Sequence, residues 1–107
     1  MARVLSISTD LMLGSKVEAQ LSAAGHEVIT APSIEESTWE GVDLIVVDLD
    51  VENSEALVGL GMPVLGYYSH VDVDTKKTAE AAGVDLVVPR SRMARELPAL
   101  AEGLLHV

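Results

Sequence analysis

Charged and hydroxyl side chains follow four apolar segments of this chain, at the point where each segment ends. The apolar run 44–47 stops at Asp48, and Asp50 comes two positions later. A carboxylate at the end of a buried strand either has a polar partner or takes part in chemistry, because an isolated buried charge is costly. The residues that follow the other three segments are Ser8, Thr9 and Asp10; Tyr68, Ser69, His70 and Asp72; and Arg90, Ser91 and Arg92.

Two kinds of chemistry are open to these side chains. Asp10 and Asp48, with Asp50 as a third carboxylate, are oxygen ligands of the type that Mg²⁺ binds. Arg90 stands near the expected start of a helix, where a cation is unfavourable. We therefore expect a carboxylate to hold it, and Asp48 is the predicted partner. Structural alternatives stay open, since Asp48 can accept backbone hydrogen bonds from the next turn, and Asp10 and Asp72 can each cap a helix.

The elements that must position these residues alternate along the chain. We expect strands at 3–8, 26–31, 43–49, 63–69 and 85–89, and helices at 10–25, 72–83 and 91–107. The segment 33–41 opens with Ser33 and Glu36 at the spacing of a capping box, which predicts a short helix, and 52–61 is expected to be a short helix or an irregular segment. The last helix contains Pro98, which should delay its start or kink it. This alternation predicts an α/β fold of three layers, with a parallel sheet between helices. The strand-end residues should then gather at the carboxyl edge of the sheet.

Composition excludes several classes of function. The 107 residues fit a single domain (1–107), and the absence of Cys excludes disulfides and thiol chemistry. A net charge of −10 opposes binding to nucleic acid or to anionic membranes. We expect no enzyme, because no Gly-rich phosphate loop follows the first strand and no Ser–His–Asp set is apparent. Without a visible leader or a long apolar span, the expected location is cytoplasmic.

The order of the elements, with "DLIVVDL" at 43–49 and "AEAAGVDLVV" at 79–88, resembles a response-regulator receiver domain over the whole chain. The resemblance implies a flavodoxin-like sheet with strand order 2-1-3-4-5. In that family an aspartate ending the third strand accepts a phosphoryl group from a histidine kinase, and an acidic pair after the first strand holds Mg²⁺. A Ser or Thr after the fourth strand and a Lys after the fifth contact the phosphoryl oxygens.

The resemblance implies that Asp48 occupies the phosphoacceptor position, but its neighbours depart from the family pattern. Ser8 and Thr9 occupy the positions of the acidic pair, and Arg90 occupies that of the lysine. Tyr68 falls on the switch hydroxyl position, next to Ser69. The segments 33–42 and 50–62 are short, so the second and third helices should be shortened.

The switch of the family should also be altered. In receiver domains an aromatic ring on the fifth strand follows the switch hydroxyl inward, and here that aromatic position is Val87. We therefore expect the ring of Tyr68 to fill the space permanently and to lock one conformation.

These departures predict a receiver-like signalling or regulatory module that acts through protein–protein contacts, with Mg-dependent aspartyl phosphorylation lost or unconventional. No cofactor is expected. Mg²⁺, held by Asp10 and Asp48, is expected only if the site is functional. The expected partner is a protein such as a kinase or an output protein, or a second copy bound through the fourth and fifth strand–helix units. The alternatives are a functional single-domain response regulator phosphorylated on Asp48, and a flavodoxin-like protein that binds a small ligand.

Overall fold

The computed structural model describes residues 2–35, 39–51, 54–68 and 73–105, and its centre is one five-stranded parallel sheet. The strand order is β2-β1-β3-β4-β5, as the resemblance implied. The strands are β1 (Arg3–Ile7), β2 (Glu27–Ala31), β3 (Leu44–Asp48), β4 (Val64–Tyr68) and β5 (Leu86–Pro89). Each begins and ends within one or two residues of its predicted bounds.

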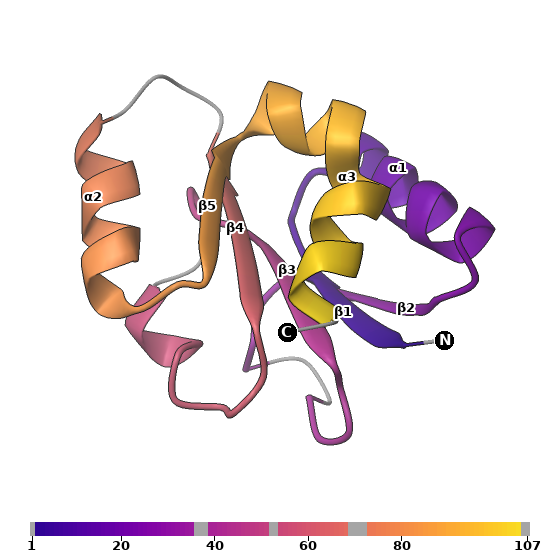
Figure 1. Cartoon of the computed structure of the whole chain (residues 1–107), viewed down its shortest axis with the longest axis horizontal. Helices are drawn as coiled ribbons and strands as arrows, with labels where there is room; N and C mark the ends of the chain where they lie inside the picture. The colour runs from indigo at the N-terminus through magenta and orange to yellow at the C-terminus, as the bar shows by residue number, and fades with distance from the viewer. Residues whose placement is uncertain (1, 36–38, 52–53, 69–72, 106–107) are drawn as a thin grey trace.

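Helices cover both faces of the sheet and give the predicted three layers (Figure 1). On one face, α1 (Leu11–Ala23) and α3 (Arg90–Leu105) lie side by side, while α2 (Val73–Ala82) lies on the other. The third helix expected from the sequence is a single 3-10 turn, η1 (Ser54–Ala56). No helix in the described ranges is long and apolar enough to cross a membrane.

Two apolar clusters, one on each face of the sheet, make the core. The cluster under α1 and α3 contains Leu13, Val17 and Leu21, whose spacing of four residues puts them on one face of α1. The opposite cluster contains Ala79 from α2 and the apolar side chains of the connections, including Leu57. All five residues of β3 are buried, because this strand lies at the centre of the sheet with both faces covered.

Two helix predictions need correction. The helix expected at 33–41 is not found in its described residues 33–35 and 39–41, none of which is helical. Pro98 does not delay the last helix, which begins at Arg90 and continues through the proline. A proline leaves the carbonyl four residues earlier without its usual donor. Here that carbonyl belongs to Ala94, and the side chain of Gln20 on α1 donates to it at 3.0 Å.

Candidate functional site

The polar residues predicted to gather at the carboxyl edge of the sheet come from three elements. Asp10 lies between β1 and α1, Asp48 ends β3, and Arg90 is the first residue of α3. Because β1 and β3 are neighbours in the sheet, their carboxyl ends bring Asp10 and Asp48 to the same edge. The charges of Asp10 and Arg90 both influence the pKa of Asp48, which places the three groups in one site.

Asp10 uses its two carboxylate oxygens for two different contacts. Oδ1 accepts a hydrogen bond from the backbone N–H of Leu13 at 3.1 Å, so Asp10 is the N-cap of α1. Oδ2 accepts from Nη2 of Arg90 at 2.7 Å, which forms an ion pair. The hydrogen bond from Leu13, followed by the one from Arg90, lowers the pKa of Asp10 below its ordinary value.

The prediction that Arg90 pairs with Asp48 is wrong, because the carboxylate that Arg90 binds is that of Asp10. Arg90 contacts Asp10, and it influences Asp48 only through its charge. One oxygen of Asp48, Oδ1, instead accepts the backbone N–H of Asp50 at 2.9 Å, which was the structural alternative for this residue. Asp48 therefore accepts its hydrogen bond from the connection that follows β3, rather than from α3.

Asp48 is an almost buried carboxylate, with 8% of its surface exposed. Burial raises its pKa, and the hydrogen bond from the N–H of Asp50 opposes that rise. The charges of Asp50 and Asp10 raise this pKa further, and the charge of Arg90 lowers it. Asp48 therefore ionises less readily than an exposed aspartate.

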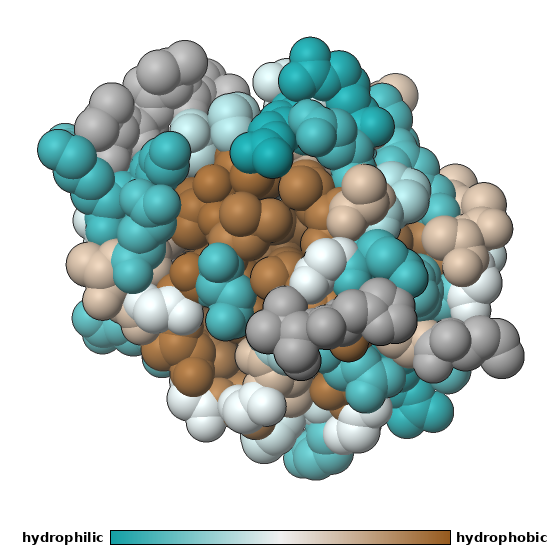
Figure 2. Space-filling model, viewed as in Figure 1, coloured by the Kyte–Doolittle hydropathy of each residue, from teal (hydrophilic) through white to brown (hydrophobic). Residues whose placement is uncertain are grey.

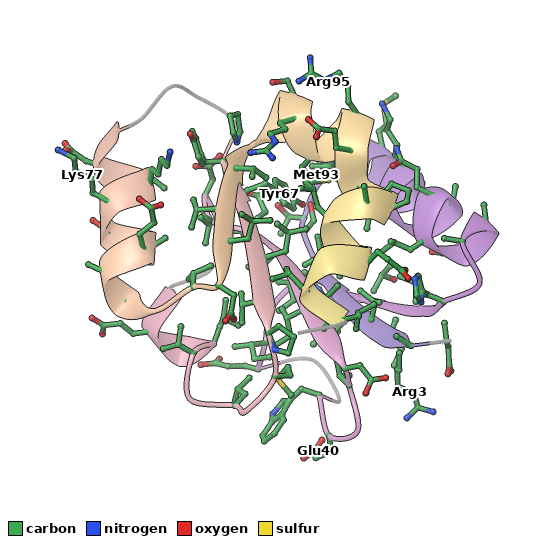
Figure 3. The ribbon with its side chains drawn as sticks, viewed as in Figure 1. Arg3, Glu40, Tyr67, Lys77, Met93 and Arg95 are labelled. Carbon is green, nitrogen blue, oxygen red and sulfur yellow. The ribbon has the colours of Figure 1, made fainter. Side chains whose placement is uncertain are left out.

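Tyr67 is a site residue that the sequence analysis did not single out. It pairs with Asp48 in the register of β3 and β4, so the two side chains leave the sheet on the same face. Tyr67 is 1% exposed and packs in the same cluster as Met93, on the side of the sheet that α3 covers (Figure 3). Because alternate residues of a strand share one face, pairing β4 with β3 residue by residue would have identified Tyr67.

The hydroxyl of Tyr67 is buried beside polar groups. Burial raises the pKa of Tyr67 to about 12, and the hydroxyl of Ser8 lies near enough to lower it, although it does not reach hydrogen-bonding geometry. Within the described part of the chain, no hydrogen bond satisfies this hydroxyl. Ser8 itself accepts the backbone N–H of Asp10 at 3.0 Å.

The remaining predicted residues fall into three groups. Tyr68 is buried on the α2 side of the sheet, in the same cluster as Val87. That its ring fills the space behind the site and locks one conformation stays a prediction. Thr9 and Asp50 are exposed at the edge of the site. Ser69, with His70 and Asp72, lies outside the described residues.

The carboxylates that could ligate Mg²⁺ already have other contacts in this arrangement. Mg²⁺ needs near-octahedral oxygen ligands, usually with one or two carboxylates among them. Both oxygens of Asp10 and one oxygen of Asp48 are already engaged by N–H donors. Among the residues described, no group of three His, Cys, Asp or Glu side chains is placed to hold a metal.

Sequence comparison and structure comparison give different answers for this chain. No protein-family model matches it, and no curated protein matches its sequence. Solved structures match it closely. A CheY-like response regulator receiver domain protein from Methanospirillum hungatei superposes with a TM-score of 0.87 at 19% identity, with 99% of this chain and 94% of that one covered. A response regulator from Thermotoga maritima gives a TM-score of 0.84 at 18% identity, with coverage of 100% and 99%.

A longer relative contains the same fold as one part. NtrX from Brucella abortus, solved with ADP, matches with a TM-score of 0.83 at 21% identity. The match covers 98% of this chain but only 26% of NtrX. At these identities the comparisons establish the fold, which is that of response-regulator receiver domains with a flavodoxin-like α/β sheet.

Proposed function

We propose that this chain is a receiver-like signalling or regulatory module that acts through protein–protein contacts, without conventional phosphorylation of Asp48. The proposal includes no catalytic activity, no resident cofactor and a cytoplasmic location. The observation that carries it is the ion pair of Arg90 with Asp10, together with the N-cap bond of Asp10. The carboxylate best placed to replace the missing acidic pair is thereby occupied by the chain's own donors.

The electrostatics of the site support this proposal. Phosphoryl transfer to a carboxylate brings two anions together, and charge neutralisation supplies most of the catalysis. In the described residues, the charges that influence Asp48 are two carboxylates, Asp50 and Asp10, and one guanidinium, Arg90. Because Asp10 neutralises Arg90, an incoming phosphoryl group would meet a net negative site.

Phosphorylation in vitro tests the proposal. The protein is incubated with Mg²⁺ and acetyl phosphate and its intact mass is measured, and amide NMR spectra are recorded with and without beryllofluoride. We expect no added phosphoryl group and no shifts near Asp48. A response that Asp48→Asn abolishes would show a functional single-domain response regulator and overturn the proposal.

A restored variant serves as the positive control. Ser8→Asp and Thr9→Asp supply the missing acidic pair, and Arg90→Lys supplies the compact cation of the family while releasing Asp10. If the missing ligands are the cause, this triple variant should respond to Mg²⁺ and beryllofluoride where the wild type does not. Ser91→Ala is the matched neutral control, since Ser91 is exposed beside Arg90.

Self-association through β4, β5 and the helices that follow them is part of the same proposal. Residues 73–107 carry five Lys and Arg and five Asp and Glu, so the net charge of −10 resides in residues 1–72. Apolar side chains gather between α2 and α3 on the face shown in Figure 2. The partly buried side chains of β5 and α3 include Leu86, Leu100 and Leu104. Two copies can bring these faces together without strong repulsion.

Analytical ultracentrifugation tests this contact. We expect a concentration-dependent dimer that Leu104→Asp disrupts, and that Leu11→Asp, at the start of α1 and outside this surface, leaves intact. Purely monomeric behaviour at high concentration would remove the second copy from the proposal and leave a different protein as the partner.

A further inference from the structure

A cavity of about 400 Å³ lies at the carboxyl edge of the sheet, between α1 and the end of β2. Four residues on one face of α1 line it: Leu11, Gly14, Ser15 and Glu18. Residues 8–10 and 30–32, which follow or end β1 and β2, line the rest. Asp48 is not part of this lining, so the α1 cavity, as we call it, is distinct from the phosphoacceptor position. Open α/β sheets bind ligands outside the carboxyl ends of their strands, and cavities of this size hold small molecules.

Gly14 leaves one wall of the α1 cavity without a side chain. It lies inside α1, where glycine is less favourable than every other residue except proline. A Cβ atom at Gly14 would meet no atom within 4 Å, so packing among the described residues does not require a glycine. The glycine therefore lowers the helix propensity of α1 and keeps space open in the cavity.

Several polar groups of the lining are open to a ligand. Within the described residues, no hydrogen bond engages the hydroxyls of Thr9, Ser15 and Thr30. No Lys or Arg in the same part of the chain pairs with the carboxylate of Glu18. Asp10 differs, because both of its oxygens already accept hydrogen bonds. The α1 cavity thus offers three hydroxyls and one unpaired carboxylate.

The charges of the lining favour a cation over an anion. The first turn of a helix attracts anions through its free N–H groups, but here the carboxylate of Asp10 already accepts the N–H of Leu13. None of the lining residues is Lys or Arg. A phosphate or a carboxylate would therefore meet Glu18 without a counter-charge, whereas an ammonium group would pair with it.

The apolar part of the lining can hold a carbon skeleton. It consists of Leu11 on α1 and, across the cavity, Ala31 and Pro32. Leu11 is 86% exposed, so the described residues leave most of its side chain uncovered. We call these three residues the apolar wall. A ligand that combines carbon with polar groups matches both parts of the lining.

We propose that the α1 cavity binds a small hydroxylated organic amine. Its ammonium group pairs with Glu18, its hydroxyl groups bond to Ser15 and Thr30, and its carbon skeleton packs on the apolar wall. An amino sugar and a hydroxylated aryl amine both present these groups. The inference goes beyond the proposed function, because it requires neither phosphorylation of Asp48 nor a partner protein.

Amide NMR titration of the full chain tests the inference. The probes are glucosamine and tyramine, in slightly acidic buffer where both amines are protonated. Their controls are glucose and 4-ethylphenol, which lack the amine, and glucosamine 6-phosphate, which adds an anion. We expect at least one amine to shift the amides of Gly14, Ser15, Glu18 and Thr30, and its controls to bind at least tenfold more weakly. The amine that binds distinguishes an amino sugar from an aryl amine.

Two matched pairs of variants make the test specific. Glu18→Gln keeps the size of the side chain and removes its charge, and Glu80→Gln is its control at an exposed position of α2. Gly14→Leu places a side chain in the α1 cavity, and Gly103→Leu is its control in α3. Both glycines have open Cβ positions, so both variants should fold. We expect Glu18→Gln and Gly14→Leu to weaken binding of the amine at least tenfold, and both controls to leave it unchanged.

Several results would overturn the inference. No shifts with either amine would remove the site, and equal binding of an amine and its amine-free control would remove the role of Glu18. Equal weakening by Glu18→Gln and Glu80→Gln would leave only general charge attraction. None of these results bears on the beryllofluoride experiment, so the proposed function can stand if the α1 cavity binds no amine.

Discussion

The guanidinium of Arg90 and the carboxylate of Asp10 lie 2.7 Å apart and join the start of α3 to the start of α1. Eighty positions separate the two residues in the chain. Asp10 caps α1 with one oxygen and holds Arg90 with the other. The pair thus links two helix starts. It also supplies a counter-charge to Arg90, a cation that the dipole of α3 disfavours at the start of that helix.

Substitutions at Asp10 should separate its two roles. Asp10→Asn keeps a side-chain acceptor for Leu13 and loses the charge, whereas Asp10→Ala loses both contacts. Since both partners are about 40% exposed, the pair should contribute little to the free energy of unfolding. Loss of the cap should lower it further. Urea unfolding should therefore rank the free energy of unfolding as wild type, then Asn, then Ala.

A double-mutant cycle with Arg90→Ala supplies the control for this ranking. Arg90→Ala should cost little in the Asp10→Asn background, because the pair is already broken there. If Arg90→Ala costs equally in both backgrounds, the pair does not stabilise the fold.

Asp48→Asn should stabilise the protein at neutral pH. Burial raises the pKa of Asp48 in the folded protein, so the folded state binds this proton more tightly than the unfolded chain does. The corresponding stability is present below the unfolded value, 3.8, and is lost as pH rises through the folded pKa. An asparagine can keep the bond from the N–H of Asp50 and avoids the buried charge.

Thermal unfolding across pH measures this difference. The melting temperature of Asp48→Asn should exceed that of wild type near neutral pH, and the two should converge as pH falls below 3.8. Glu40→Gln, at an exposed carboxylate, is the control. A lower melting temperature for Asp48→Asn at neutral pH would show that the ionised carboxylate has a stabilising partner.

Tyr67→Phe should leave the protein at least as stable as wild type. The hydroxyl of Tyr67 is buried, and none of the described residues satisfies it. A buried group without a hydrogen-bond partner costs roughly 1–3 kcal/mol, and phenylalanine removes the group while the ring keeps its packing. Unfolding in urea at neutral pH measures the change. A loss of more than about 1 kcal/mol would show that the hydroxyl has a partner in solution.

The sheet was predictable from the sequence because local patterns determine it. The run 44–47 is apolar without alternation, which is typical of a central strand buried on both faces, and β3 has that position. The spacing of Leu13, Val17 and Leu21 likewise predicted α1 and its buried face. The segment 33–41 has Ser33 and Glu36 at the spacing of a capping box but no apolar stripe, and its described residues are not helical.

The contacts of the site were less predictable, because they depend on distances between elements. Two carboxylates at one edge compete for Arg90, and strand order alone does not decide between Asp10 and Asp48. Tyr68, not Tyr67, ends β4 in the sequence, and only the register of β3 with β4 pairs Tyr67 with Asp48. A side chain that points toward a site from within a strand is identified only when neighbouring strands are paired residue by residue.

The side chain of Gln20 should contribute to the stability of the protein only because Pro98 is present. Its side-chain amide donates to the carbonyl of Ala94, the group that a residue other than proline at position 98 would bond through its own N–H. Gln20→Met keeps most of the side-chain volume and leaves that carbonyl without this donor, at a cost of roughly 1–3 kcal/mol. In a Pro98→Ala background the helix supplies the donor, so Gln20→Met should cost clearly less.

Urea unfolding of the four proteins in this cycle measures the coupling between Gln20 and Pro98. Lys16→Met, at an exposed position of the same helix, is the control and should change the free energy of unfolding by less than about 0.5 kcal/mol. Equal costs for Gln20→Met with and without Pro98 would mean that Gln20 stabilises α3 through packing. A smaller cost without the proline would show that a contact from α1 makes the proline in α3 tolerable, so that the two helices can flank the Asp10–Arg90 pair.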